Sequence, residues 1–360
     1  MKLVIFGLSI SSSWGNGHAT LWRGLCRALR NRSHRIVFYE HNTPYYEANR
    51  DLVELPGIKL TIYSRWEDVR GDAARDLEDA DVAIVTSYCP DAILASDLVL
   101  NSTTIRVFYD LDTPITLEAL QAANPIRYIG PTGLRDFDLV LSYTGGGALD
   151  ALKQKLGAQR VAPLYGSVDP AIHHPAASVE RFRSDLSYLG TFAENRQPML
   201  DSLFLETAKK CRQSWFLIGG ALYPPDFPWQ HNIAYFPHVP PLDHSAFYSS
   251  SRLTLNITRS PMAAMGFCPS GRLFEAAACS TAILSDRWAG LEDFFSPGTE
   301  IITAANSDDA VNALSLSDSE LRQIGTAARE RALEDHTADR RAQELEEILQ
   351  CVKSRDQVEV

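Results

Sequence analysis

The chain has 360 residues, of which 45% are hydrophobic and 22% are charged, and its formal net charge is −11. This length suits two domains better than one core, and the composition is that of a globular protein. No apolar run approaches the ~20 residues needed to span a bilayer, so we expect no transmembrane segment. The negative charge argues against a general affinity for nucleic acid, and we expect a small-molecule partner.

The N-terminus and the cysteines both favour a cytoplasmic location. Residues 1–9 (MKLVIFGLS) are apolar, but the run is short and lacks the cleavage pattern of a signal peptide, so it is interpreted as a strand. The six cysteines form no CxxC pair and no cluster with histidine at zinc spacing. We therefore expect reduced thiols and predict no metal site.

Short apolar runs alternate with helix-like segments along most of the chain. Strands are expected at residues 3–8, 35–40, 81–87, 104–110 and 138–144, and in a second series at 186–192, 214–220, 233–239, 252–258 and 281–286. This rhythm is typical of parallel, doubly wound sheets. The sequence therefore predicts an α/β protein with two Rossmann-like domains.

A linker separates the two series of strands. Residues 161–178 are rich in proline, glycine and small residues. We predict a first domain at 1–165, a second at 166–335 and a C-terminal helical segment at 336–360. Leu345 and Leu349 lie four positions apart in that segment, which predicts an apolar face.

The first candidate site follows the first predicted strand. Gly15 and Gly17 permit a sharp turn before a helix whose first N–H groups are free, and His18 lies at this mouth of the sheet. An imidazole here has the pKa range needed to accept a proton from a hydroxyl. The alternative is that His18 only caps or packs the loop.

Two carboxylates end the fourth predicted strand. Asp110 and Asp112 precede Pro114, which stops strand pairing. They have the chemistry to orient a histidine, bind sugar hydroxyls or hold a metal, and metal is the least favoured because no third oxygen ligand is evident. The alternative is a turn held together by hydrogen bonds of Asp112 and Thr113.

The second domain offers two loops to a ligand. Gly190 and Thr191 form a turn after a strand, and Arg196 precedes a helix, an arrangement that suits a diphosphate. A solvated arginine is the alternative. A proline-rich loop further along offers the backbone groups of His238 and Val239 to a base, which is a weaker signal.

The segment SGRLFEAAACSTAILSD (270–286) joins a helix to a strand. Pro269, Ser270 and Gly271 indicate a helix start, with Ser270 as the N-cap. Arg272 at this N-terminus favours a phosphate, and Glu275 one turn later suits the two hydroxyls of a ribose. The alternative is a surface Arg–Glu pair.

With these residues the sequence resembles glycosyltransferases of the GT-B fold, in particular the group-1 type and the spore-maturation CgeB-like branch. Four segments carry the resemblance: 272–302 (RLFEAAACSTAILSDRWAGLEDFFSPGTEII), 163–175 (PLYGSVDPAIHHP), 186–200 (LSYLGTFAENRQPML) and 336–349 (HTADRRAQELEEIL). They correspond to the donor-binding segment, the interdomain linker, the phosphate loop and a C-terminal helix that crosses back to the first domain. The resemblance implies two domains facing a central cleft.

One position departs from the family pattern. Group-1 enzymes carry a second glutamate eight positions before the ribose glutamate, and here that position is Phe267. The departure leaves the donor sugar and the stereochemistry open. The segment GNGHATLWRGL is similar to the histidine loop of inverting members, which implies that His18 is the base, steadied by Asp112 or, as the less favoured choice, Asp110.

These features predict a metal-independent enzyme that moves a sugar from a nucleoside diphosphate sugar, with UDP as the guessed nucleotide, to an acceptor hydroxyl. Gly190, Thr191, Arg196, Ser270, Gly271 and Arg272 are expected around the diphosphate, with Glu275 at the ribose and His238 and Val239 at the base. His18 and Asp112 are expected at the acceptor. A sugar-nucleotide epimerase and a non-catalytic nucleotide-sugar-binding protein remain the alternatives.

Overall fold

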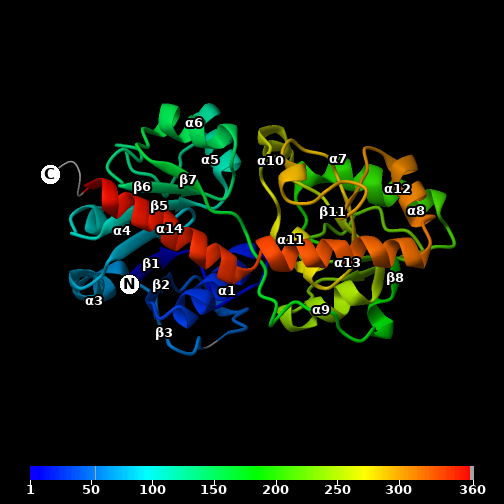
Figure 1. The fold of residues 1–360 in the computed structure, drawn as a ribbon, viewed down its shortest axis with the longest axis horizontal. Coiled ribbons are helices and arrows are strands. Elements are labelled where there is room, and N and C mark those ends of the chain that lie inside the picture. Colours follow the sequence, from blue (N-terminus) through cyan, green and yellow to red (C-terminus); the bar gives the residue numbers. More distant parts are fainter. Residues whose placement is uncertain (53, 357–360) are drawn as a thin grey trace. The chain divides into compact units, whose positions relative to one another are not determined.

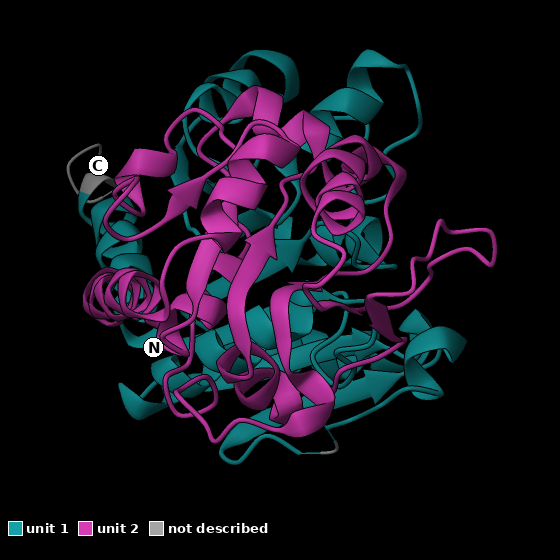
Figure 2. Ribbon diagram, turned by 90° about the vertical axis from the view of Figure 1, so that its right-hand side faces the viewer, with its two compact units in different colours: residues 1–165, 338–360 teal, residues 166–337 magenta. Residues whose placement is uncertain are grey.

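The chain is described by a computed structural model that covers residues 1–52 and 54–356. It divides into two compact units, which Figure 2 shows in different colours. Unit 1 contains residues 1–165 together with the C-terminal residues 338–360, and unit 2 contains residues 166–337. Each unit has its own parallel sheet and its own core.

Unit 1 is built on a seven-stranded sheet in the order β3-β2-β1-β4-β5-β6-β7. Its strands are β1 (Lys2–Gly7), β2 (Arg35–His41), β3 (Ile58–Tyr63), β4 (Val82–Thr86), β5 (Ile105–Asp110), β6 (Leu139–Ser142) and β7 (Val161–Pro163). All neighbouring strands are parallel, and β1 pairs with β2 on one side and with β4 on the other. The strand order therefore reverses between β1 and β4.

Helices cover both faces of this sheet (Figure 1). They are α1 (Gly17–Asn31), α2 (Pro44–Glu47), α3 (Trp66–Glu78), α4 (Ala92–Leu100), α5 (Thr113–Gln121), α6 (Gly147–Leu156) and α14 (Ala338–Asp356). Successive residues of β1 point to opposite faces, so Leu3 and Ile5 enter one core and Val4 and Phe6 enter the other. Burial on both faces explains why the strands are continuously apolar.

The C-terminal helix α14 belongs to unit 1 and is the red helix of Figure 1. Leu345 and Leu349 are fully buried in the core that also contains Leu25 and Leu29 of α1. This confirms the predicted apolar face. The helix begins at Ala338, later than the predicted segment, because His336 ends the preceding helix.

Unit 2 contains a six-stranded parallel sheet in the order β10-β9-β8-β11-β12-β13. Its strands are β8 (Ser184–Leu189), β9 (Phe216–Gly219), β10 (Ile233–Phe236), β11 (Ser251–Asn256), β12 (Ala282–Ser285) and β13 (Ile302–Thr303). Its α-helices are α7 (Gln197–Leu200), α8 (Glu206–Lys210), α9 (Pro241–Ser249), α10 (Ser260–Met265), α11 (Gly271–Ala278), α12 (Ser307–Leu314) and α13 (Asp318–Asp335). The strand order here reverses between β8 and β11.

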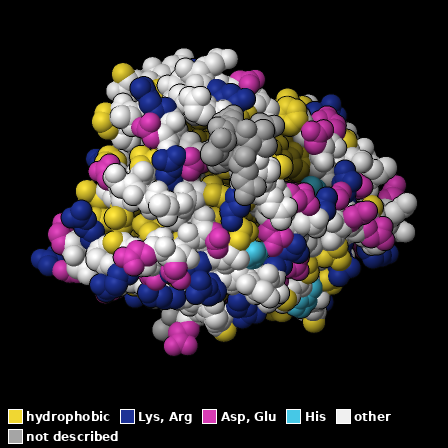
Figure 3. Space-filling view, turned by 60° about the vertical axis from the view of Figure 1, so that its left-hand side comes forward, with side chains coloured by type: hydrophobic (Ala, Val, Ile, Leu, Met, Phe, Trp, Pro, Cys, Tyr) yellow, Lys and Arg dark blue, Asp and Glu magenta, His cyan; other side chains and the backbone are white. Residues whose placement is uncertain are grey.

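The α/β fold with two parallel sheets is confirmed, and all ten predicted strands are present. The prediction omitted β3, β7 and β13, which lie at the edges of the two sheets. Their residues are mostly half-buried, and β7 and β13 are also very short. Such strands carry a weak apolar signal because one side of the ladder faces solvent. No helix within the described residues has the length and apolarity to cross a membrane. Acidic and basic side chains are interspersed on the face seen in Figure 3.

Candidate active site

The predicted site residues lie at the carboxyl ends of the strands in both units. In open α/β sheets, ligands bind at this edge where the strand order reverses. The loop after β1 lies at the reversal in unit 1, and the loops after β8 and β11 lie at the reversal in unit 2.

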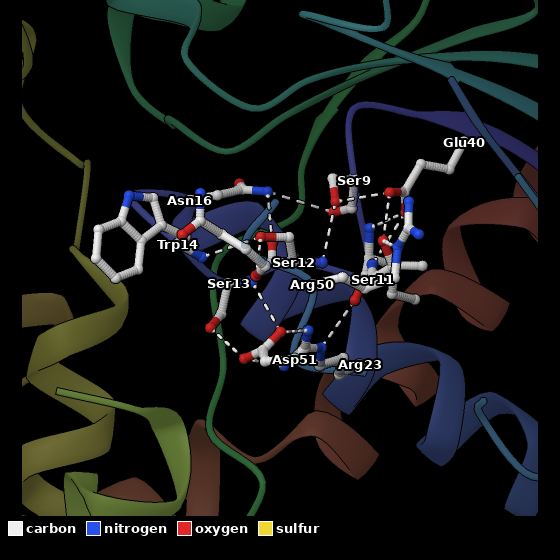
Figure 4. Close-up of polar contacts among 12 residues, drawn as sticks. Ser9, Ser11, Ser12, Ser13, Trp14, Asn16, Arg23, Glu40, Arg50 and Asp51 are labelled. Carbon is white, nitrogen blue, oxygen red and sulfur yellow. Dashed lines mark hydrogen bonds and ion pairs between the residues drawn. The ribbon is translucent and has the colours of Figure 1, made fainter. Parts of the chain in front are cut away.

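A buried carboxylate holds the loop that follows β1 (Figure 4). Glu40 of β2 is fully buried and accepts hydrogen bonds from Ser9 Oγ at 3.0 Å, from the Ile10 N–H at 2.7 Å, and from the Ser11 N–H and Oγ at 2.9 and 2.5 Å. Arg50 Nε donates to Ser11 Oγ at 3.0 Å. Four donors satisfy a charge that would otherwise be costly to bury, so this loop has one well-defined path.

A second carboxylate fixes the same loop closer to its helix. Asp51 accepts from the Ser13 N–H and Oγ, at 3.1 and 2.5 Å, and from Arg23 Nη2 at 2.6 Å. Burial raises the pKa of Asp51, but these donors outweigh it and lower the pKa overall. Asn16 then caps α1, because its Oδ1 accepts from the N–H of His18 at 3.0 Å. The histidine therefore starts a helix whose entry is anchored at several points.

The structure brings His18 and Asp112 together. His18 Nε2 lies 3.8 Å from Asp112 Oδ2, and their side chains are 17% and 19% exposed. His18 Nδ1 is buried and has no hydrogen-bond partner in the described structure. Asp112 occupies the N-cap position of α5, but its side chain makes no capping bond. The side chain instead faces the imidazole, which is the geometry needed to stabilise a protonated histidine.

Asp110 has a different environment from Asp112. It ends β5 and is fully buried, its Oδ1 accepts from the N–H of Asp112 at 3.2 Å, and burial raises its pKa to about 6. Of the two carboxylates considered for pairing with His18, the described ion pair involves Asp112. Asp110 is therefore better suited to shaping the start of α5 than to contacting a substrate.

Two glycines in unit 2 allow very close backbone contact. A Cβ on Gly220, whose φ is +149°, would lie 2.1 Å from the carbonyl oxygen of Gly190 and 3.0 Å from the nitrogen of Thr191. A Cβ on Gly190 would lie 2.8 Å from Arg272 Nη2. Only glycine fits either position without displacing a neighbour. The loop after β8 is thus pressed against both β9 and the arginine of α11.

Arginines gather beside this loop. Arg272 Nε donates to the Leu189 carbonyl, its Nη1 donates to Asn256 Oδ1 at 3.1 Å, and its guanidinium lies 5.0 Å from the ring centre of Tyr188. Arg196 Nη1 donates to the carbonyl of Thr191 at 3.2 Å, and its Nε is buried without a partner. Burial lowers the pKa of Arg196, and the neighbouring charges of Arg272 and Arg259 lower it further. The loop therefore carries concentrated positive charge.

The N-terminus of α11 differs in one respect from the prediction. Ser270 holds the N-cap position, but its hydroxyl makes no capping bond and instead donates to Asn256 Oδ1 at 2.7 Å. The predicted N-cap position is confirmed, but the side-chain capping bond is absent because the buried Asn256 amide at the end of β11 offers a competing acceptor. Asn256 Oδ1 also binds Arg272, so a single amide links the helix start to the arginine.

Glu275 lies in the same helix, but its contacts are with histidines and a tyrosine. Tyr248 Oη donates to its Oε2 at 3.4 Å, His173 Nε2 lies 4.0 Å from Oε1, and His244 Nδ1 lies 3.8 Å from Oε2. Among the described residues, no ion pair joins Glu275 to Arg272. The alternative of a surface pair between these two residues is therefore not observed.

The sequence did not predict this cluster. Each of His173, His244 and Glu275 offers one ligand atom, and these atoms lie within 4.8 Å of one another, a spacing at which a metal ion could be held. The search for metal ligands by sequence spacing missed them because they come from the linker, from α9 and from α11. The one sequence feature that could have indicated the cluster is the pair of adjacent histidines, His173 and His174, in the linker.

The proline-rich loop after β10 lies beside the same cluster. Val239 is buried, and its carbonyl oxygen is 3.1 Å from His244 Nε2. This carbonyl is therefore already engaged by a side chain. His238 is half-buried in the same loop.

Comparisons with known proteins agree with this architecture. Residues 196–347 match the family model described as glycosyl transferase-like. Among solved structures, sucrose-phosphate synthase from Thermosynechococcus elongatus is similar over 99% of this chain and 100% of its own, with 12% identity and a TM-score of 0.72. Anabaena HepE in complex with UDP and glucose is similar over 97% and 99%, with 11% identity and a TM-score of 0.71.

A third similar structure is an alpha-glucosyltransferase in complex with UDP-glucose and DNA containing an abasic site. It covers 97% of this chain and 99% of its own, with 12% identity and a TM-score of 0.71. At these identities the likeness establishes the fold, which is the GT-B fold. A search of curated proteins finds no match.

Proposed function

We propose that the protein is a glycosyltransferase that moves a sugar from a nucleoside diphosphate sugar to an acceptor hydroxyl. Glycosyl transfer is supported by the family match over residues 196–347 and by the GT-B fold of the whole chain. UDP is the proposed nucleotide, since two of the similar structures contain UDP or UDP-glucose. Membership of the CgeB-like branch is part of the same proposal.

The observation that carries the proposal is the arginine cluster beside the loop after β8. The described partners of Arg196 and Arg272 are carbonyl oxygens and an amide, so their charges are not neutralised by a carboxylate in those contacts. A diphosphate supplies the missing negative charge through bidentate hydrogen bonds. Of the Gly190–Thr191 turn, the N–H of Thr191 would be the further donor, because the Gly190 N–H already donates to the Gly219 carbonyl at 2.7 Å. Ser270 and Gly271, at the start of α11, border the same position.

The proposed donor site continues along α11 and the loop after β10. Glu275 lies one helical turn beyond Arg272 and would accept hydrogen bonds from the ribose hydroxyls. His238 and Val239 would line the base through their backbone groups, although the Val239 carbonyl already contacts His244. In this proposal, the phosphate, ribose and base contacts follow one another along one edge of the sheet of unit 2.

Acceptor activation is assigned to unit 1. His18 would take the proton of the acceptor hydroxyl, whose oxygen forms the new bond to the anomeric carbon while the nucleoside diphosphate departs with the old bonding pair. Asp112 would stabilise the resulting imidazolium from 3.8 Å. The arginines would stabilise the charge on the leaving diphosphate, and for this reason we propose that transfer needs no divalent metal.

Isothermal titration with UDP and UDP-glucose tests the donor site. Arg272→Met should weaken UDP binding about 10- to 100-fold, which is the loss expected for charge-assisted hydrogen bonds. Arg287→Met is the matched control, because Arg287 is an exposed arginine of the same unit that contacts Thr303 Oγ1. Its UDP affinity should stay within about twofold of the unchanged protein.

The result that would overturn the proposal is equal UDP affinity in the unchanged protein and in folded Arg272→Met. Failure of every nucleoside diphosphate to bind would overturn it as well. Incubating the protein with the bound nucleotide sugar alone separates the alternatives, since an epimerase would isomerise the donor without an acceptor.

A further inference from the structure

Two histidines with unpartnered ring nitrogens surround the Glu275 carboxylate. His173 is 2% exposed, and neither of its ring nitrogens has a hydrogen-bond partner in the described structure. His244 Nδ1 is buried and unpartnered in the same way. A buried polar group without a partner costs about 1–3 kcal/mol, so three such atoms beside one carboxylate point to a polar ligand.

The distances favour a hydroxyl ligand over a metal ion. A hydroxyl oxygen that makes two hydrogen bonds of about 2.8 Å, at an angle of roughly 90–110°, joins atoms about 4.0–4.6 Å apart. A tetrahedral zinc ion with bonds of about 2.0–2.1 Å draws its ligand atoms to roughly 3.3 Å from one another. The observed separations from the carboxylate are 4.0 Å for His173 Nε2 and 3.8 Å for His244 Nδ1. They lie nearer to the hydroxyl spacing.

The donors and acceptors also match a pair of hydroxyls. His244 Nε2 donates to the Val239 carbonyl, and with the N–H of the ring committed there, Nδ1 is left as the acceptor. Burial lowers the pKa of His173 to about 4, so its ring is neutral and carries one N–H donor. The Glu275 carboxylate is the second acceptor. A vicinal diol supplies two hydroxyl hydrogens for these two acceptors and an oxygen for the His173 N–H, while the second ring nitrogen of His173 remains an acceptor outside this match.

We propose that His173 and His244 bind the ribose diol of the donor together with Glu275, and thereby select ribonucleotides over deoxynucleotides. The inference rests on the proposed function, since it takes the ribose from the nucleotide assigned above. The side chains of Glu275 and His244 are each 13% exposed, so they form the accessible part of the site. His173 forms its floor, and Tyr248 holds the carboxylate from the side.

The test compares UDP with 2′-deoxy-UDP and 3′-deoxy-UDP by isothermal titration. In the unchanged protein, loss of either hydroxyl should weaken binding about 10- to 100-fold, because a buried histidine or carboxylate loses its partner. His173→Leu should reduce this discrimination to within about threefold. His173→Gln places an amide near the position of Nε2 and should retain most of it.

Variants of His244 provide a second test, which does not require the substitution of a fully buried residue. His244→Gln places an amide near Nε2, keeping the contact with Val239, but removes the acceptor at Nδ1. His244→Asn places an amide near Nδ1, keeping an acceptor there, but removes the contact that Nε2 makes with Val239. We expect His244→Gln to lose discrimination against one of the two deoxynucleotides and His244→Asn to retain more of it.

The outcomes separate the inference from the proposed function. If UDP binds and both deoxynucleotides bind equally well to the unchanged protein, the diol site is overturned while the nucleotide site stands. Micromolar binding of zinc chloride that requires both histidines, with discrimination unchanged in the variants, would show a metal site instead. If no nucleoside diphosphate binds, the proposed function and the inference both fail.

Discussion

At the scale of single residues, the paired His18 and Asp112 are the part of the site most directly open to test. We expect His18→Ala to lower kcat about 10²- to 10⁴-fold, the usual contribution of a general base, with little change in the Kd for UDP, which unit 2 is proposed to bind. Asp112→Asn should lower kcat by a smaller factor, since it removes the charge but keeps the shape. Steady-state kinetics and thermal melting of both variants provide the measurement.

A packing role for His18 predicts a different pattern. His18→Ala would then lower the melting temperature while kcat for the folded protein stayed within a fewfold of its original value. The double variant adds a further check, because two residues that act as a unit lose less together than the sum of their separate effects.

The resemblance to inverting glycosyltransferases implied the pairing of His18 with Asp112, or with Asp110 as the less favoured choice, and the common edge at which parallel strands end made such a pairing physically reasonable. The same reasoning could not predict the surroundings of Glu275. His173 and His244 reach it from the linker and from α9, which are not strand ends, and no local pattern joins them. Sequence reasoning was also wrong about the Ser270 side chain, since the competing Asn256 amide is adjacent only in the folded chain.

At the scale of elements, two helical glycines should respond in opposite ways to the same substitution. Gly325 of α13 packs against the backbone, and a Cβ there would lie 2.2 Å from the Ser280 carbonyl oxygen and 3.1 Å from the Ala282 nitrogen. Gly71 of α3 is exposed, and its nearest atom is the flexible end of Arg75 at 4.0 Å. Gly325→Ala should therefore destabilise the protein by about 1–3 kcal/mol, through overpacking.

Gly71→Ala is the matched control and should stabilise the protein by about 0.5–1 kcal/mol, because alanine loses less backbone entropy in a helix. Urea denaturation of the two variants measures both effects. If both variants changed the free energy of unfolding equally and with the same sign, the close approach of α13 to the residues at the start of β12 would not limit stability.

At the scale of the whole molecule, apolar strand patterns predicted both sheets, since buried parallel strands are the strongest signal such a chain contains. The patterns say little about the polar groups that the two cores enclose. Within the described residues, each unit buries one aspartate at a strand end: Asp110 is the last residue of β5 in unit 1, and Asp286 follows β12 in unit 2. Burial raises the pKa of each from 3.8 to about 6.

These two carboxyls should make stability fall as the pH rises through the range from about 4 to 6. In that range the folded protein binds more protons than the unfolded chain, so unfolding becomes easier as protons are removed. A shift of this size corresponds to at most roughly 3 kcal/mol per carboxyl. Glu346 acts oppositely at lower pH: hydrogen bonding from Arg32 lowers its pKa to about 2, so its contribution is lost only below pH 4.5.

Chemical denaturation at pH 4.5 and at pH 7.5, compared between variants, therefore reports the buried aspartates. His173, whose pKa burial lowers to about 4, changes stability with the opposite sign over this range, but it does so equally in every variant. We expect the unchanged protein to be less stable at pH 7.5 with respect to these two groups, and Asp110→Asn to remove about half of the difference, because the amide cannot ionise. Asp286→Asn should remove the remainder. This substitution also weakens the hydrogen bond that Thr258 Oγ1 donates to the side chain at 3.1 Å. The quantity to compare between variants is therefore the difference in unfolding free energy between the two pH values. A pH difference that is the same in Asp110→Asn as in the unchanged protein would mean that this carboxyl stays ionised in the core, and its burial would then need a compensating charge.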